Sequence, residues 1–223
     1  MKKLLGVLAG GVVFGAAAAM LFQGKMDSIE SAGGSSTVAV YNGTEHIVTV
    51  YVAFGADSVV LPGAWSFCTG SGLTCQFPLA GHGTQVLPLS GKYLNATMAF
   101  DSLVGCGATK AELNVNNPRW YDTLDVSLVD GYSNKIAIDV VDRGTKILLG
   151  PPNGKTGNEK VFGVFPYGCD CCTKRQAPPC GIPPGGSGCK GGSQYHPDVP
   201  CQWQGSVMGG GSKVRVALVG TPA

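Results

Sequence analysis

The sequence predicts an all-β fold, a sandwich of short strands joined by tight turns. Short runs of alternating apolar and polar residues recur along the chain, and turn-forming residues separate them. No amphipathic helical pattern of any length occurs before Gly150. Only 13% of the 223 residues are charged and 35 are glycine, a composition that suits strands and turns better than long surface helices. Many short strands at regular spacing are typical of a β-sandwich.

The alternating runs predict the strands in order. The first, 37–41, ends at Asn42-Gly43, a dipeptide that favours a two-residue hairpin, so 46–52 is expected to return beside it. Further strands are expected at 84–89, 93–100, 111–116, 121–129, 136–141, 146–149 and 213–219. The last of these follows a long segment rich in Gly, Pro and Cys, so we expect that segment to be an insertion before the final strand.

The N-terminus carries an export signal. Lys2 and Lys3 precede an uncharged apolar run, 4–22, with small residues at 17–19, as in a secretory signal peptide. The run is also long enough to cross a bilayer core, which takes about 20 residues of helix, with the lysines on the cytoplasmic side. We expect cleavage, with a membrane anchor as the alternative. Both interpretations place the globular part outside the cell, either secreted or tethered to a membrane.

Cysteine usage agrees with export, because disulfides persist in oxidising compartments. We expect Cys68 and Cys75 to pair and close a small loop, whereas the other pairings stay open. The number of cysteines, nine, is odd, so at least one thiol is free or bonded to another chain. The nine cysteines are Cys68, Cys75, Cys106, Cys169, Cys171, Cys172, Cys180, Cys189 and Cys201.

These features predict five parts of the chain. The Gly/Pro/Cys-rich part is too poor in apolar residues to build much core, so we expect cross-links to hold it together. The parts are a signal peptide or membrane anchor (1–22), a polar tether (23–36), the sandwich core (37–149), the disulfide-rich insertion (150–205) and the final strand (206–223).

Charge and motifs exclude several classes of function. The net charge is only +2 and no basic run with interleaved aromatics occurs, which argues against nucleic-acid binding. The three histidines are scattered, and in an exported chain the cysteines favour disulfides over zinc. No glycine-rich phosphate loop lies between a strand and a helix, so we expect neither a metal nor a cofactor. Sequons at Asn42 and Asn95 predict glycosylation wherever the host has that machinery.

Two segments resemble the thaumatin-like family. Residues 125–132, Asp-Val-Ser-Leu-Val-Asp-Gly-Tyr, match a family motif at eight consecutive positions. The strand around Ala111-Glu112 is similar to the family's Ala-Glu-aromatic strand, and 37–42 is similar to its opening strand and turn. The resemblance implies an antiparallel β-sandwich with a disulfide-rich loop insertion that forms one wall of an acidic cleft. It also implies binding of β-1,3-glucans and, in some members, their cleavage.

Carried over by position, Glu112, Asp125 and Asp130 match three acidic cleft residues of the family, and Tyr132 belongs to the matched motif. The family's arginine has no counterpart, since its position falls near Gly105. Independently of the resemblance, the short connection between 111–116 and 121–129 predicts Glu112 and Asp125 as neighbours across an antiparallel pair.

Two carboxyl groups are the usual requirement for hydrolysing a glycosidic bond. Glu112 would be the acid, and Asp125 or Asp130 the base. The alternative is structural: a glutamate on a solvated strand face and an aspartate that only forms a turn. Trp120, Tyr121, Tyr132, Tyr167 and Trp203 are candidates for stacking on sugar rings or for core packing.

We therefore predict a monomeric, secreted protein that acts in defence, for example against fungi, or in the cell wall. It would bind β-1,3-glucan-type polysaccharide in an acidic cleft through Glu112, Asp125, Asp130 and Tyr132. One alternative is an endo-β-1,3-glucanase that uses the three acids as catalytic residues. The other is a structural surface protein that binds no sugar.

Overall fold

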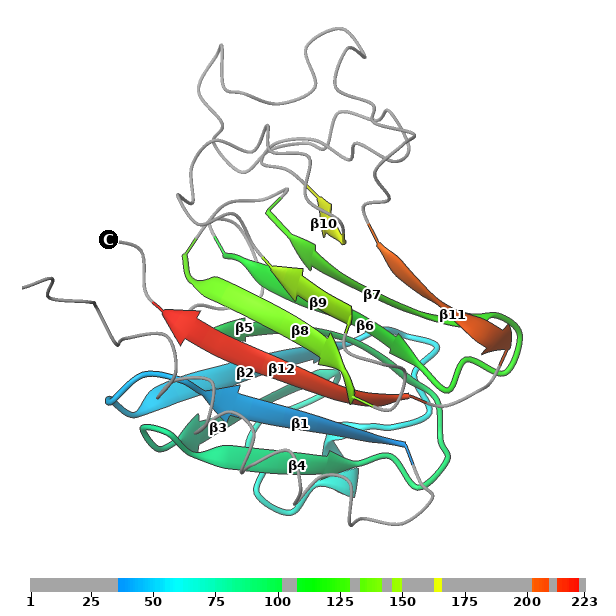
Figure 1. Cartoon of the computed structure of the whole chain (residues 1–223). Helices are drawn as coiled ribbons and strands as arrows, with labels where there is room; N and C mark the ends of the chain where they lie inside the picture. The colour runs from blue at the N-terminus through cyan, green and yellow to red at the C-terminus, as the bar shows by residue number, and fades with distance from the viewer. Residues whose placement is uncertain are drawn as a thin grey trace, which may run out of the picture. The chain divides into compact units, whose positions relative to one another are not determined.

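A computed structural model describes residues 36–101, 108–128, 133–141, 146–149, 163–165, 202–208 and 212–220. Within 146–149 and 206–208 the description covers the backbone alone. All of these residues belong to one unit, Gly34–Ala223. They form β-strands arranged in two sheets, with one short 3-10 helix, η1 (Pro62–Ala64), between the second and third strands (Figure 1).

The first sheet has five strands in the order β4-β1-β12-β8-β9. Its first and last strands in the chain, β1 and β12, lie side by side and run parallel, while the other pairs are antiparallel (Figure 1). The strands are β1 (Thr37–Asn42), β4 (Thr84–Pro88), β8 (Lys135–Val140), β9 (Lys146–Leu149) and β12 (Lys213–Gly220).

The second sheet has seven strands, in the order β10-β7-β6-β5-β2-β3, with β11 also paired to β7. Only the short β10 runs parallel to its partner. The strands are β2 (Val48–Phe54), β3 (Thr74–Leu79), β5 (Leu94–Phe100), β6 (Lys110–Val115), β7 (Tyr121–Ser127), β10 (Val164–Phe165) and β11 (Trp203–Met208).

One hydrophobic core joins the two sheets. Alternate residues of each strand point inward, such as Val38 and Val216 in the five-stranded sheet and Val50, Leu113 and Leu124 in the seven-stranded sheet. Strand β8 contacts β6 and β7 across the core. The predicted all-β sandwich is thus confirmed, and its sheets are mixed because two of the strand pairs are parallel.

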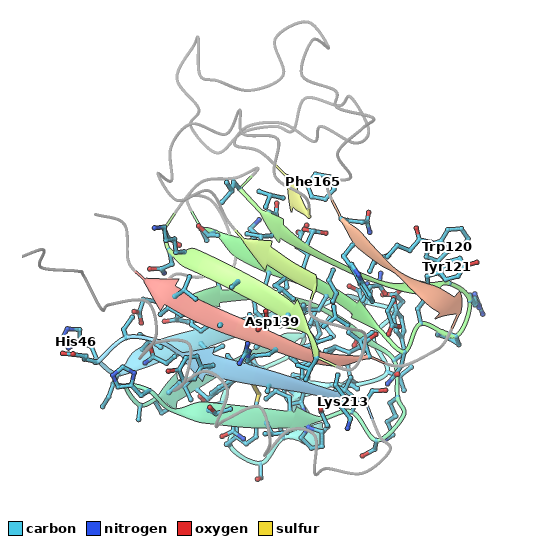
Figure 2. All side chains as sticks on the ribbon, in the orientation of Figure 1. His46, Trp120, Tyr121, Asp139, Phe165 and Lys213 are labelled. Carbon is cyan, nitrogen blue, oxygen red and sulfur yellow. A yellow bond between two sulfur atoms is a disulfide. The ribbon has the colours of Figure 1, made fainter. Side chains whose placement is uncertain are left out.

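A buried ion pair fixes the centre of the five-stranded sheet. Arg215 on β12 and Asp139 on β8 are register partners, and the Arg215 Nε donates to the Asp139 Oδ2 at 2.6 Å. Both side chains are buried on the face opposite the core, and Figure 2 labels Asp139. A buried carboxylate needs such a partner, because losing its water is costly.

The hairpin predicted at Asn42-Gly43 is wrong. Strands β1 and β2 belong to different sheets, so the chain crosses the sandwich at this point. Gly43 packs against β12: a Cβ added there would lie 2.5 Å from the carbonyl oxygen of Leu218. The glycine therefore permits a close approach to β12, and long-range packing overrides the local turn preference.

Three strands were not expected from the sequence. In β3, Cys75, Phe77 and Leu79 alternate into the core, but Pro78 argues against a strand. The strands β10 and β11 pair with β7, and β11 begins at Trp203, inside the predicted insertion. Residues 150–162 and 166–201, with the predicted cross-links among their cysteines, lie outside the described residues, as does Cys106.

Candidate functional site

The face of the seven-stranded sheet that points away from the core is mostly polar. Its side chains alternate along each strand with residues of the hydrophobic core, so they must point to the opposite side. We call this surface the polar face. It comprises Thr49, Tyr51 and Ala53 (β2), Thr74 and Gln76 (β3), Asn95, Thr97 and Ala99 (β5), Lys110, Glu112 and Asn114 (β6), and Tyr121, Thr123, Asp125 and Ser127 (β7).

Two carboxyl groups are direct neighbours on the polar face. Glu112 of β6 and Asp125 of β7 are register partners in an antiparallel pair, as the sequence predicted. Side chains opposite each other in such pairs have Cβ atoms about 4.5–5.5 Å apart. The same register continues across the sheet to Thr97 on β5, then to Ala53 on β2 and Thr74 on β3.

Exposure increases across the polar face from β7 to β3. Asp125 is only 6% exposed, and Thr123 and Ser127 beside it are buried as well. Glu112 is half-buried, whereas Thr74 on β3 is exposed. The carboxyl pair therefore lies at the boundary between a covered part and an open part of the face.

This arrangement supplies one buried and one partly solvated carboxyl group side by side. Neighbouring carboxyl groups in different surroundings are typical of acid–base pairs, and the half-buried Glu112 can accept hydrogen bonds from sugar hydroxyl groups. The other two predicted site residues, Asp130 and Tyr132, lie outside the described residues. A shared cleft of three acids and Tyr132 therefore stays a prediction.

An exposed aromatic pair lies beside the turn between β6 and β7. Trp120 is 54% exposed and contacts Tyr121 edge to face, with ring centroids 5.5 Å apart (Figure 2). Tyr121 starts the row of β7 residues on the polar face. Trp203, in contrast, belongs to the hydrophobic core, and Tyr167 lies outside the described residues. Of these sugar-stacking candidates, Trp120 and Tyr121 have the exposure that stacking requires.

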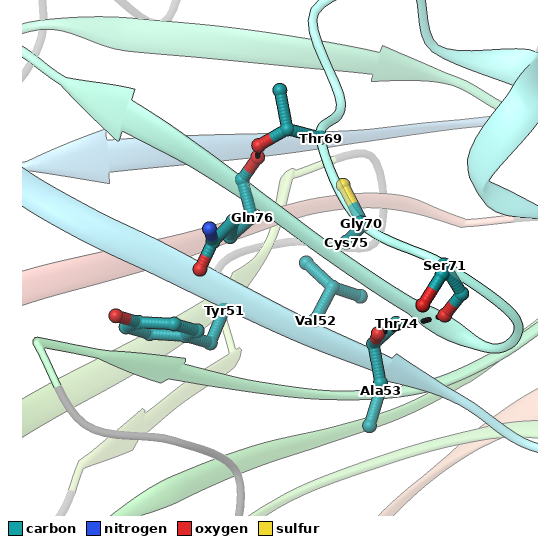
Figure 3. A pocket seen from close by; sticks show the side chains of 9 residues that line it. All are labelled: Tyr51, Val52, Ala53, Thr69, Gly70, Ser71, Thr74, Cys75 and Gln76. Atoms are coloured by element: carbon teal, nitrogen blue, oxygen red, sulfur yellow. Dashed lines mark hydrogen bonds between the residues drawn. The ribbon is translucent and has the colours of Figure 1, made fainter.

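A pocket at the β3 side of the polar face was not anticipated. It has a volume of about 450 Å³ and lies against β2, β3 and the loop before β3 (Figure 3). Its lining includes Tyr51, Ala53, Thr69, Ser71, Thr74 and Gln76. The sequence signal for this pocket is the cysteine pair Cys68 and Cys75, which lies at the two ends of the loop and predicts only a cross-link.

The disulfide Cys68–Cys75 is present as predicted. Its Cα atoms are 5.4 Å apart, and it closes the loop that forms one wall of the pocket. Thr69 and Gln76 bridge the loop further through backbone hydrogen bonds in both directions, at 3.0 and 2.7 Å. The wall of the pocket is consequently held by covalent and hydrogen bonds together.

The two sequons differ in their surroundings. Asn42 is 0% exposed, and its amide nitrogen donates hydrogen bonds to backbone carbonyls, including that of His46 at 2.6 Å. A glycan on this nitrogen is incompatible with those contacts in the folded protein. Asn95 is half-buried, and its amide nitrogen donates to the Asp57 Oδ1 at 2.6 Å.

Asp57 also shapes the electrostatics around Tyr93. The Tyr93 hydroxyl donates to the Asp57 Oδ2 at 3.3 Å. Burial raises the pKa of Tyr93 above its ordinary value, and the negative charge of Asp57 together with this hydrogen bond raises it further. Tyr93 is therefore held in its neutral form.

Two other kinds of site, a membrane-spanning helix and a metal centre, are absent from the described part of the chain. No helix among these residues is long and apolar enough to cross a membrane. No group of three or more His, Cys, Asp or Glu side chains there is placed to hold a metal ion. The apolar run 4–22 lies outside the described residues.

The chain is similar to known proteins in its three-dimensional structure but not in its sequence. No protein-family model matches the chain, and no curated protein sequence does. Among solved structures, the chain is similar to the protein elicitor MoHrip2 from Magnaporthe oryzae, with 12% identity and a TM-score of 0.43, covering 83% of this chain and 99% of that one. It is also similar to the thaumatin-like xylanase inhibitor TLXI, with 12% identity and a TM-score of 0.40, covering 81% of this chain and 97% of that one. At this level of similarity, neither protein's activity is transferred to this chain.

Proposed function

We propose that this protein binds a neutral polysaccharide of the β-1,3-glucan type across the polar face. The observation that supports this most is the pairing of Glu112 with Asp125 in register, on a face otherwise rich in hydroxyl and amide groups. The similarity of residues 125–132 to the thaumatin-like motif favours the same class of ligand.

The chemistry of the face suits a neutral sugar. Carboxylates are strong acceptors for hydroxyl donors, and charge-assisted hydrogen bonds are about twice as strong as neutral ones. Thr97 and Asn114, next to Glu112, add a hydroxyl and an amide within the same sheet surface. Trp120 and Tyr121 provide aromatic surface at the end of the face, where the apolar side of a pyranose ring can stack.

The test is co-sedimentation of the full-length protein with insoluble β-1,3-glucan. Glu112→Gln keeps the shape of the side chain but removes its charge, so we expect binding to weaken about 10-fold or more, as for loss of one charge-assisted hydrogen bond. Glu45→Gln is the matched control, because Glu45 is exposed and lies outside the polar face. Equal binding by Glu112→Gln and Glu45→Gln contradicts the proposed site. A wild-type protein that does not sediment favours the structural surface protein instead.

Hydrolysis is the second candidate function, favoured by the different burial of the two paired carboxyl groups. A retaining glycosidase has carboxyl groups about 5–5.5 Å apart, and register partners, whose Cβ atoms lie about 4.5–5.5 Å apart, can bring their carboxyl groups to such a separation. Because burial favours the protonated form of a carboxyl group, the buried Asp125 is proposed as the acid and the more solvated Glu112 as its ionised partner, which exchanges the roles expected from the sequence. Release of reducing ends from β-1,3-glucan should then disappear in Glu112→Gln and in Asp125→Asn. Release that persists in Glu112→Gln shows that Glu112 is not catalytic.

A further inference from the structure

We propose that the pocket between β2, β3 and residues 69–74 is a separate, uncharged subsite that takes one neutral hexose unit. This inference deepens the proposed polysaccharide binding and rests on it for the identity of the polymer. The pocket itself is defined independently of the carboxyl pair, by its own lining and volume of about 450 Å³. That volume lies within the usual range of about 300–1,000 Å³ for small-molecule sites.

The lining of the pocket selects against ions and for a polyol. None of the lining residues is charged, so an ionic ligand would lose water without gaining a counter-charge. Tyr51 and Gln76 are register partners, which sets an aromatic ring beside a carboxamide. Within the described residues, the Tyr51 hydroxyl and the Gln76 carboxamide make no hydrogen bond, which leaves both available to a ligand. An aromatic ring with hydroxyl and amide neighbours is the chemistry that neutral sugars require.

The pocket is formed before any ligand arrives. Besides the disulfide and the backbone bridge, the Thr74 hydroxyl donates to the Ser71 carbonyl at 2.9 Å. A Cβ at Gly70 would lie 2.3 Å from the Thr74 carbonyl oxygen, so a glycine is needed for this loop to pack as it does. A pre-organised wall lowers the entropy lost on binding.

The pocket and the carboxyl pair lie within reach of one sugar chain. The row Thr74–Ala53–Thr97–Glu112 crosses three neighbouring strand pairs. At about 4.8 Å per strand, this row spans about 14 Å. The side chains between Thr74 and Glu112 in this row, Ala53 and Thr97, are small, so they do not obstruct a ligand that lies across the strands. An oligosaccharide that runs across the strands can therefore occupy the pocket and contact Glu112 together.

The test is an NMR titration of the full-length protein with two probes, methyl β-D-glucopyranoside and a β-1,3-linked glucose hexasaccharide. The monosaccharide should shift the backbone amide signals of Val52, Ala53 and Gly70 at the pocket, and the hexasaccharide should also shift that of Glu112. Gln76→Ala should abolish the monosaccharide shifts and weaken hexasaccharide binding about 5- to 30-fold, as for the loss of one or two neutral hydrogen bonds.

Gln85→Ala is the matched control, because Gln85 lies on β4 in the other sheet. Hexasaccharide shifts near Glu112 with none at the pocket overturn the subsite and leave the proposed function standing. If the monosaccharide shifts signals at the pocket but neither the hexasaccharide nor the insoluble glucan binds, the subsite is supported and binding of the β-1,3-glucan polymer is refuted. If Gln76→Ala and Gln85→Ala lose sugar affinity equally, the assignment of Gln76 to the subsite is overturned. If neither probe shifts any signal, both proposals are overturned.

Discussion

Replacing Asn42 with alanine is expected to destabilise the fold by about 4 kcal/mol, although its sequence context suggests a surface turn. Its amide nitrogen faces the backbone carbonyls of His46 at 2.6 Å and of Leu79 and Ala80 at 3.1 Å each. Its Oδ1 accepts from the Thr44 backbone N–H at 3.0 Å and from the Thr44 hydroxyl at 2.7 Å. The amide carries only two hydrogens, so at most four of these five bonds form at once.

The magnitude follows from those four hydrogen bonds. Each contributes about 1 kcal/mol net, and the partners left behind at this buried site have little access to replacement water. The sum of about 4 kcal/mol is a large part of the 5–15 kcal/mol by which domains are typically stable. Asn42→Asp should be at least as damaging, because it turns a donor into an acceptor among carbonyl oxygens.

The assay is urea unfolding of protein made in a host without N-glycosylation. Asn42→Ala should lower the midpoint with an unchanged slope, as a change in stability alone does. Thr44→Val is the control: it destroys the same sequon but removes only one hydrogen bond, so about 1 kcal/mol is expected. A loss below about 1 kcal/mol for Asn42→Ala, or equal losses for the two variants, refutes the hydrogen-bond argument.

Two further predictions concern buried ionisable groups. Arg215→Met leaves the buried Asp139 without its cation, so it should destabilise the fold by about 3–5 kcal/mol in urea unfolding. Adding Asp139→Leu removes the unpaired carboxylate and should restore most of that loss in stability. A double variant that is no more stable than the single variant contradicts this account. Asp57→Asn should lower the pKa of Tyr93 part of the way toward its ordinary value, because burial still raises it, and NMR titration of the ring carbons would detect this. A raised folded-state pKa gives stability that is complete below about pH 10, the ordinary tyrosine pKa, and is lost as pH rises through the folded value. Asp57→Asn narrows the gap between the two pKa values, so the loss of stability above about pH 10 should be smaller than in the wild type. An unmoved Tyr93 pKa rules out a contribution from Asp57.

Local patterns were enough to predict several elements of the fold and one feature of the site. Period-two alternation located strands such as β6 and β7, because successive side chains in a strand point to opposite sides. The short connection between those strands then made Glu112 and Asp125 neighbours. Cys68 and Cys75 are only seven residues apart, so their pairing also followed from proximity in the chain.

Other features depended on contacts between residues far apart in the sequence. Asn42-Gly43 has the local preference of a hairpin, yet β1 pairs with β12 and β4, and Asn42 is buried at the crossover. The burial of Asp125 and the pocket beside Tyr51 likewise depend on what packs around each strand.

By itself, the sequence determined the all-β class, most strand positions and the adjacency of the two carboxyl groups. The tertiary structure alone decided which strands share a sheet, which polar groups are covered, and where the sheet face opens into a pocket. The physical reason is that alternation and turn preference act over a few residues, whereas burial and pairing depend on side chains brought together from distant parts of the chain.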